Sequence, residues 1–233
     1  MDMPLKAPRN RTAELQLILR HVAKGYVFWT ADEIPLCKLT GFLKKWEHLR
    51  ILADPPARSW RKRIGRANTH LVLEHLFNGR EGVPLSPEMK VRWLLLGAAG
   101  RDGLDDSSVP QPGAVLDART AAGRVLWMGY ELVYQRKTFK TADGRLKSDS
   151  TWTWRIPVQR YKEWEAHVVC AAKQLDYSAL AKTFAILGAF PMFAGIRKQV
   201  FQLFSETNKM LRKVGGIPMK KLELPYVTLT RIW

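Results

Sequence analysis

Apolar residues recur at intervals of three and four along residues 12–49, which is the spacing of one face of an α-helix. Residues 12–24 predict a first amphipathic helix, with Thr12 as its cap and Gly25 as its stop. Residues 30–35 predict the start of a second helix, which continues to residue 49. The faces of this second helix that are not apolar carry Lys38, Lys44, Lys45 and His48, so we expect a basic solvent side.

A strongly basic segment follows the second helix. The run Asp54-Pro55-Pro56 is incompatible with helix continuation, because proline lacks the amide hydrogen that a helix interior needs. Residues 58–66 and 69–73 then predict a strand, a turn and a second strand. The expected product is a β-hairpin with a basic first strand.

The middle of the chain predicts one buried element and one long loop. Ser86, Pro87 and Glu88 combine an N-cap, a first-turn proline and a first-turn acid ahead of an apolar run. Residues 86–96 therefore favour a buried helix, with a core strand as the alternative for so short a run. Residues 100–123 are rich in Asp, Pro and Gly, which predicts a loop.

The second half of the chain predicts a hairpin followed by helices. Residues 124–156 favour two strands joined by a turn at residues 142–145. Pro157, Asp176 and Pro191 each introduce a helical stretch, and the last stretch ends at Gly215-Gly216. Residues 226–233 predict a short strand-like end.

These elements place the chain in the α+β class. We expect a winged-helix-like basic module over residues 1–80 and a linker of one helix and an acidic, Pro- and Gly-containing loop over residues 81–123. Residues 124–233 would then form a domain made of a β-hairpin and a helical bundle.

The net charge of the chain adds to this fold prediction, because it indicates a class of binding partner. The 233 residues contain 38 Lys and Arg against 21 Asp and Glu, for a net charge of +17 and a pI near 10.1. The excess is +8 over residues 1–80 and +10 over residues 129–233, whereas residues 81–128 carry −1. Such a chain repels itself unless a polyanion neutralises it. Nucleic acid is therefore the expected partner, and charge that serves solubility alone is the alternative.

Other features bear on compartment and cofactors. No apolar run reaches the roughly 18–20 residues of a membrane span, and the N-terminus lacks a secretory signal pattern, so we expect a cytoplasmic protein with no membrane partner. Cys37 and Cys170 each lie among apolar residues, which predicts reduced core thiols rather than a disulfide or a zinc site. No cofactor is predicted.

Two helices followed by a basic hairpin, over residues 10–78, resemble in outline a winged-helix DNA-binding domain. In that family the second helix enters the major groove and the hairpin tip follows the phosphate backbone. The resemblance implies that Lys38, Lys44, Lys45 and His48 face the groove, and that the wing carries Arg58, Arg61, Lys62, Arg63 and Arg66. The whole chain looks like an accessory protein of a bacterial mobile element or nucleoprotein assembly.

Basic residues also alternate with aromatic ones, a combination that binds phosphates and stacks on unpaired bases. Trp60 lies within the first basic cluster, and Trp152 and Trp154 lie near the last. Large aromatic rings are mostly buried, so burial in the core is the alternative for each tryptophan. The remaining candidate nucleic-acid contacts are Arg136, Lys137, Lys140, Arg145, Lys147, Arg155 and Arg160.

Signatures of catalysis are weak. The chain has no Walker-type phosphate loop, dinucleotide fingerprint or nucleophile elbow. Asp102, Asp105 and Asp106, with Glu131, could hold Mg²⁺ in a nuclease, although acids in such a loop are ordinary turn residues. A metal-free RNA endonuclease could use one histidine as a general base. We predict neither a catalytic nor a metal site.

The sequence thus predicts a non-catalytic nucleic-acid-binding protein. Duplex DNA is favoured as the ligand and RNA is the alternative, in a replication, partition or transcription role. A first rival is a subunit that grips RNA or DNA in a multi-protein complex such as an RNA-guided effector. A second rival is a metal-dependent nuclease.

Overall fold

The computed structural model describes residues 8, 10–51, 53–74, 86–141, 143–220, 222–225 and 227. Helices make up 42% and strands 21%, with antiparallel sheets, so the predicted α+β class is confirmed. The chain divides into two compact units. Unit 1 contains Met1–Val125, Arg136–Trp152 and Leu229–Trp233, and unit 2 contains Leu126–Gln135 and Thr153–Thr228. Among the described helices, none has the length and apolar character that crossing a bilayer requires.

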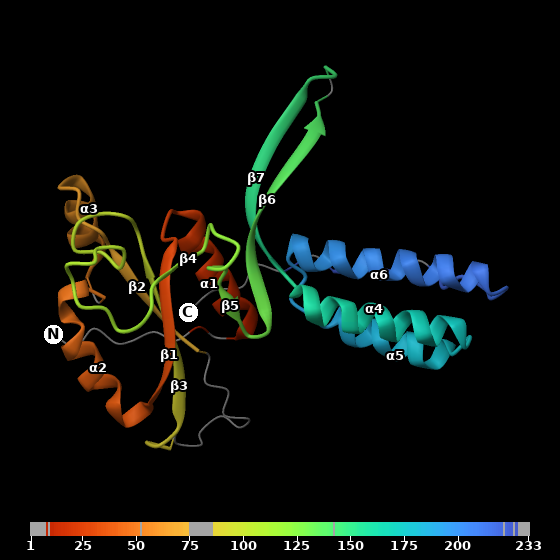
Figure 1. Ribbon diagram of the computed structural model, residues 1–233, viewed down its shortest axis with the longest axis horizontal. Helices are drawn as coiled ribbons and strands as arrows, with labels where there is room; N and C mark the ends of the chain where they lie inside the picture. The colour runs from red at the N-terminus through yellow and green to blue at the C-terminus, as the bar shows by residue number, and fades with distance from the viewer. Residues whose placement is uncertain are drawn as a thin grey trace. The chain divides into compact units, whose positions relative to one another are not determined.

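Unit 1 is built on a four-stranded antiparallel sheet with the order β2-β3-β1-β4 (Figure 1). The strands are β1 (Phe28–Pro35), β2 (Thr69–Leu73), β3 (Lys90–Gly97) and β4 (Leu116–Asp117). β1 and β2 are both antiparallel to β3, which lies between them, so β1 and β2 run in the same direction. The segment that connects β1 to β2 is therefore a crossover, and it carries two of the helices.

Three α-helices belong to unit 1: α1 (Arg11–Ala23), α2 (Leu39–Lys45) and α3 (Pro55–Arg63). Short 3₁₀ turns, Leu36–Lys38 and Glu47–Leu49, flank α2. The predicted first helix is confirmed, but its cap is Asn10 rather than Thr12, because the Asn10 side chain accepts the Ala13 amide at 2.8 Å.

The core of unit 1 lies on both faces of β3. Val91, Trp93 and Leu95 share one face and pack with the apolar side of α2. Leu94 and Leu96 point to the opposite face, because side chains alternate along a strand, and α1 packs against β2 and β3 there. β3 is thus an inner strand that is buried on both faces, which explains its nearly continuous apolar sequence.

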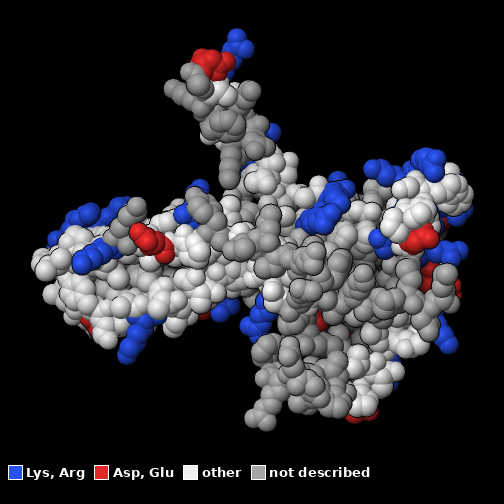
Figure 2. All heavy atoms as spheres, turned by 180° about the vertical axis from the view of Figure 1, so that it is seen from behind, with Lys and Arg blue, Asp and Glu red and all other residues white. Residues whose placement is uncertain are grey.

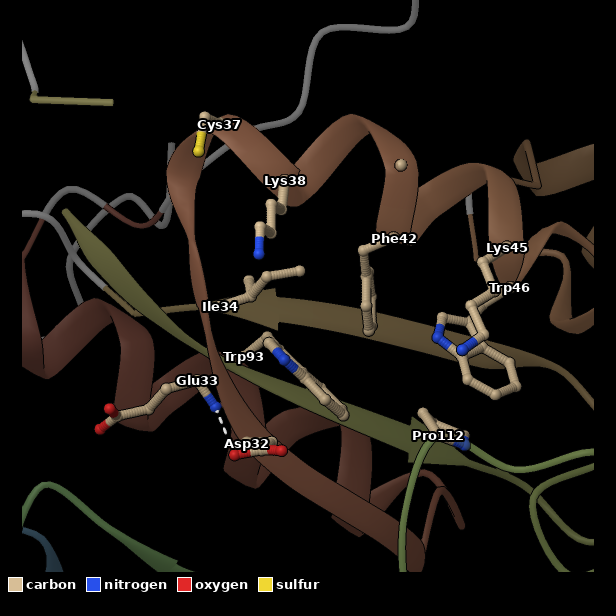
Figure 3. Close-up of a pocket in the computed structure, with 11 residues that line it drawn as sticks. Asp32, Glu33, Ile34, Cys37, Lys38, Phe42, Lys45, Trp46, Trp93 and Pro112 are labelled. Atoms are coloured by element: carbon tan, nitrogen blue, oxygen red, sulfur yellow. Dashed lines mark hydrogen bonds between the residues drawn. The ribbon is translucent and has the colours of Figure 1, made fainter. Parts of the chain in front are cut away.

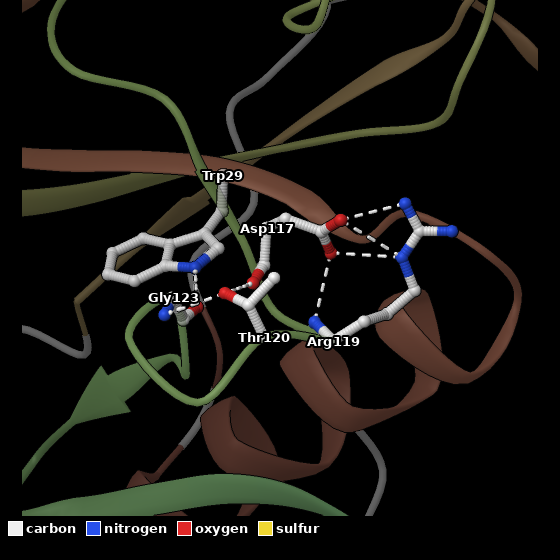
Figure 4. Close-up of polar contacts among 5 residues, drawn as sticks. All are labelled: Trp29, Asp117, Arg119, Thr120 and Gly123. Atoms are coloured by element: carbon white, nitrogen blue, oxygen red, sulfur yellow. Dashed lines mark hydrogen bonds and ion pairs between the residues drawn. The ribbon is translucent and has the colours of Figure 1, made fainter.

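The loop after β4 is fastened to β1 (Figure 4). The indole Nε1 of Trp29 donates to the carbonyl oxygen of Gly123 at 2.6 Å. Within the loop, the Arg119 guanidinium pairs with the Asp117 carboxylate at 2.7 Å, and this pairing lowers the pKa of Asp117. Thr120 Oγ1 donates to the Asp117 carbonyl at 2.9 Å and accepts from the Gly123 amide at 3.0 Å. The predicted loop over residues 100–123 is confirmed, apart from the two-residue β4.

Unit 2 contains three helices: α4 (Val158–Lys173), α5 (Tyr177–Gly188) and α6 (Ala194–Lys213). α4 packs against α5 and α6, so the predicted helical bundle is confirmed. The sheet that precedes them has the order β5-β6-β7, with β5 at Leu126–Trp127, β6 at Tyr130–Lys140 and β7 at Leu146–Arg155. This confirms the predicted hairpin, whose turn contains Gly144 at a φ of 77°.

Three predicted elements are wrong. Residues 55–63 form α3 instead of the first strand of a hairpin, because Asp54 caps a helix that begins with two prolines. β2 pairs with β3, so the basic hairpin that carries the winged-helix resemblance is not formed at this position. Residues 28–35 form β1 where a helix start was expected, and residues 90–97 form the strand that was the alternative.

Both cysteines also differ from expectation. Cys37 and Cys170 are exposed rather than buried in a core. Each follows apolar neighbours in the sequence but falls on the solvent side of its helical segment. The predicted strand-like end at residues 226–233 lies almost entirely outside the described residues.

Candidate nucleic-acid interface

Helix α3 is the most basic element of unit 1. Its nine residues include four Lys or Arg and no acid, and its N-cap is Asp54, whose Oδ1 accepts the Ala57 amide at 2.7 Å. Three of these cations lie in the last turn, where positive charge also stabilises the helix dipole. The cations of this turn differ in exposure: Arg61 is buried, whereas Lys62 and Arg63, which form an outer set, are exposed.

Arg61, together with Arg101 from the loop after β3, holds the helix in place. Arg61 is only 6% exposed, and its Nε and Nη2 atoms donate to the Ala67 carbonyl at 3.0 and 2.7 Å. Arg101 donates to the carbonyl of Ile64, the C-cap of α3, at 2.9 Å. A buried guanidinium that binds a carbonyl has a structural role, and it leaves Arg61 little surface for the predicted nucleic-acid contact. Arg66 is half-exposed and pairs with Asp102 at 3.2 Å.

The outer set faces solvent and is available for a ligand. Lys62 and Arg63 are exposed, and neither makes an ion pair with a described residue. Trp60, three residues before Arg63 on the same side of α3, is 53% exposed. In Figure 2, Lys and Arg gather at the upper right of the view, at the end of unit 1 where α3 lies. We call Trp60, Lys62 and Arg63 the outer face of α3.

The cations of α2 have a mixed setting. Lys38, Lys44, Lys45 and His48 are all exposed, as the sequence predicts. Lys38 and Lys45 line an open pocket of about 510 Å³, whose other walls include Asp32 and Glu33 (Figure 3). Because carboxylates share the pocket, it is not a uniformly cationic surface.

The same pocket has an aromatic floor. Figure 3 shows Phe42 pointing from α2 toward Trp93 of β3, and the two ring centroids are 4.8 Å apart. Both rings are almost fully buried, so they belong to the core of unit 1. Nearby, the His48 Nε2 atom lies 3.2 Å from the Pro110 carbonyl, which places this imidazole against the loop.

A cluster that sequence reasoning missed lies where α1 packs against β2. The rings of His21 and His70 are 3.9 Å apart, and Tyr26 lies 4.6 Å from His70 and 5.6 Å from His21. Burial lowers the pKa of His21 to about 4 and that of His70 to about 2, and the surrounding cations, Arg58 among them, add to both shifts. Both imidazoles are thus uncharged at neutral pH. No local spacing signals this cluster, because its members come from separate elements.

The predicted contacts in the hairpin and in unit 2 include exposed cations and cations that are held in ion pairs. Arg136 and Arg145 are exposed, and Arg145 lies 3.5 Å from Asp143. The Arg155 Nε atom pairs with Glu131, so this partly exposed cation already has a partner within the chain. Arg160 is exposed and lies over the ring of Phe190 at 5.8 Å. The side chains of Lys137, Lys140 and Lys147 lie outside the described residues.

The tryptophans near these cations are in the core or at its edge. Trp154 is fully buried, as the burial alternative expects, and Trp152 is half-buried. Of the three tryptophans considered for base stacking, Trp60 alone is exposed.

Three of the four acids of the nuclease alternative, Asp102, Asp106 and Glu131, already have partners. The Asp106 carboxylate accepts from Ser108 Oγ at 2.6 Å and from the Asp102 amide at 3.1 Å, which lowers the pKa of Asp106. Asp102 pairs with Arg66, and Glu131 pairs with Arg155. Across the described part of the chain, no three His, Cys, Asp or Glu side chains gather as a metal site would require.

No protein-family model, curated protein or solved structure matches this chain. The functional argument therefore rests on the residues of α3 and its neighbours.

Proposed function

We propose that this chain binds nucleic acid without cleaving it, and that the outer face of α3 contacts the phosphate backbone. The observation that carries the proposal is that Lys62 and Arg63 are exposed, as is Trp60 one turn before Arg63, with no carboxylate paired to either cation among the described residues. Lysine and arginine neutralise phosphates and release counterions, and an exposed indole adds a stacking surface.

The structural observation that supports this proposal differs from the winged-helix resemblance on which the sequence prediction of DNA binding was based. Duplex DNA was favoured because of the wing, and the wing position is occupied by a helix whose buried Arg61 binds the Ala67 carbonyl. The outer cations of the same segment retain their exposure. We therefore propose backbone contact through α3, acting in the cytoplasm as an accessory factor in a nucleoprotein assembly.

The test compares two double variants with the same change in net charge. Lys62→Gln with Arg63→Gln removes the outer cations from the last turn of α3, whereas Arg212→Gln with Lys213→Gln removes the same residue types from the last turn of α6. All four side chains are exposed. The measurement is the affinity for a 20-base-pair duplex as a function of salt concentration.

If Lys62 and Arg63 each contact a phosphate, their loss lowers the slope of log affinity against log salt by about 1.8, since each contact contributes about 0.9 on duplex DNA. The α6 variant keeps the wild-type slope. Equal slopes for the two variants would refute the assignment to α3.

A further inference from the structure

Three aromatic rings from separate elements form one cluster in unit 1. His21 lies in the last turn of α1, Tyr26 precedes β1, and His70 lies in β2. Tyr26 meets both imidazoles edge to face, at interplanar angles of 66° and 81°. All three residues are partly exposed. The cluster therefore offers aromatic surface to solvent rather than closing entirely on itself.

Permanent cations surround these rings. Lys24 from the end of α1 and Arg58 from α3 lie close enough to act on both imidazoles, and Arg20 acts on His21; no carboxylate among the described residues does so. Arg58 forms no ion pair among the described residues, and its buried Nε atom has no hydrogen-bond partner there. The carboxylate that acts on Arg58 is that of Asp54, and this side chain already caps α3. The cluster thus gathers positive charge that the described chain does not neutralise.

The two imidazoles add no charge of their own at neutral pH, because burial lowers the pKa of each ring well below 7. Uncharged aromatic faces flanked by fixed cations are the combination that binds unpaired nucleotides: the rings stack on the base, and the cations contact its phosphates. A base inside a duplex has both faces covered by its neighbours. An unpaired base exposes them.

We propose that the cluster of His21, Tyr26 and His70 stacks on one unpaired base of a nucleic-acid strand, and that Arg58, Arg20 and Lys24 contact the adjoining phosphates. This inference rests on the proposed function and defines its substrate class as nucleic acid with unpaired nucleotides. The cluster holds the base, whereas the outer face of α3 supplies backbone contact that is independent of pairing.

The test substitutes the tyrosine of the cluster. Tyr26→Leu removes the aromatic face, and Tyr26→Phe, which keeps it, is the matched control. Affinities are measured at one salt concentration for a 20-nucleotide oligothymidylate, a 20-base-pair duplex and thymidine monophosphate. Stacking on one base accounts for about 1–3 kcal/mol, which corresponds to roughly a 5- to 150-fold change in affinity.

We expect Tyr26→Leu to weaken oligothymidylate binding by at least fivefold, to change duplex binding less than twofold, and Tyr26→Phe to resemble the wild type. Equal losses on both long probes, or none on oligothymidylate, would overturn the proposal. Binding of the monophosphate as tight as that of the strand would identify a free-nucleotide site and would also overturn it. A wild-type salt slope in the Lys62→Gln, Arg63→Gln variant, together with an intact Tyr26 effect, would count against the proposed function alone.

A second measurement needs no variant and so does not depend on folding of Tyr26→Leu. Oligothymidylate that carries 5-iodouracil is irradiated in complex with the wild-type chain, and the crosslinked peptides are sequenced. Adducts at His21, Tyr26 or His70 support the proposal. Adducts confined to other segments, including Trp60, would overturn it.

Discussion

The imidazole rings of His21 and His70 lie 3.9 Å apart, although one belongs to α1 and the other to β2. Each ring has a lowered pKa because it is buried, and Lys24 and Arg58 act on both while Arg20 also acts on His21. In the unfolded chain a histidine takes up its proton near pH 6.5. Folding therefore excludes two protons that the unfolded chain would bind in mild acid.

This linkage predicts a pH-dependent stability. The folded pKa values lie below 6.5, so the two histidines leave the free energy of unfolding undiminished above that pH. As the pH falls toward 4, the free energy of unfolding decreases progressively. For His21 alone, the free energy of unfolding should fall by about 2 kcal/mol between pH 7 and pH 5. Urea denaturation at the two pH values measures it.

The double variant His21→Gln with His70→Gln should reduce this loss, and His48→Gln, an exposed histidine of the same unit, should leave it as in the wild type. An unchanged loss in the double variant would show that other groups cause the acid sensitivity.

Arg61 and Lys62 are adjacent cations with opposite roles. Arg61→Met removes both hydrogen bonds to the Ala67 carbonyl, which is then left buried without them, so we expect a loss of about 1–3 kcal/mol in the free energy of unfolding. Lys62→Met should change it by less than about 0.5 kcal/mol, because this side chain is exposed. Denaturant unfolding compares them, and similar values for the two variants would contradict the structural role of Arg61.

Two glycines provide a matched pair for packing. A Cβ at Gly195 would lie 2.4 Å from the Trp154 carbonyl oxygen and 2.9 Å from Thr153, where α6 begins against β7. Gly195→Ala should therefore destabilise unit 2 by at least about 1–3 kcal/mol. Gly41→Ala in α2 meets nothing within 4 Å and should stabilise unit 1 by about 0.5–1 kcal/mol, because alanine favours a helix.

Hydrogen exchange measures the two glycine variants, because it reports each unit separately. The expected result is faster exchange in α6 for Gly195→Ala and unchanged or slower exchange in α2 for Gly41→Ala. Wild-type exchange in α6 of Gly195→Ala would contradict the close approach of α6 to β7.

Trp60 should contribute to binding but not to folding. Its ring is 53% exposed, so Trp60→Ala should leave the free energy of unfolding within about 0.5 kcal/mol of the wild type. If the ring stacks on a base, the same substitution weakens oligothymidylate binding by about 1–3 kcal/mol, as anisotropy titration would show. If Trp60→Ala lowered the free energy of unfolding and left the affinity unchanged, Trp60 would have a role in folding rather than in binding.

Local signals in the sequence predict much of the fold. α1, the hairpin of β6 and β7, and the three helices of unit 2 follow from apolar spacing, turn residues and proline positions. α3 was mistaken for a strand because the Pro-Pro run was taken only as a helix terminator, whereas the same prolines after Asp54 begin a helix. β3 was mistaken for a helix because a short strand that is buried on both faces has no alternation to identify it.

The candidate site was predicted only in part. Lys62, Arg63 and Trp60 were identified from composition, and their exposure agrees with a binding role. Composition could not separate Arg61 from its neighbours, since its burial depends on contact with Ala67 across a turn. The cluster of His21 and His70 depends on the packing of α1 against β2, which no local pattern encodes.

The most direct test of nucleic-acid binding is a salt titration of the wild-type chain with an oligonucleotide. We predict tight binding at low salt, with log affinity falling linearly against log salt concentration, because each phosphate contact releases condensed counterions. Failure to bind either oligothymidylate or duplex at about 50 mM salt, despite a net charge of +17, would contradict the account.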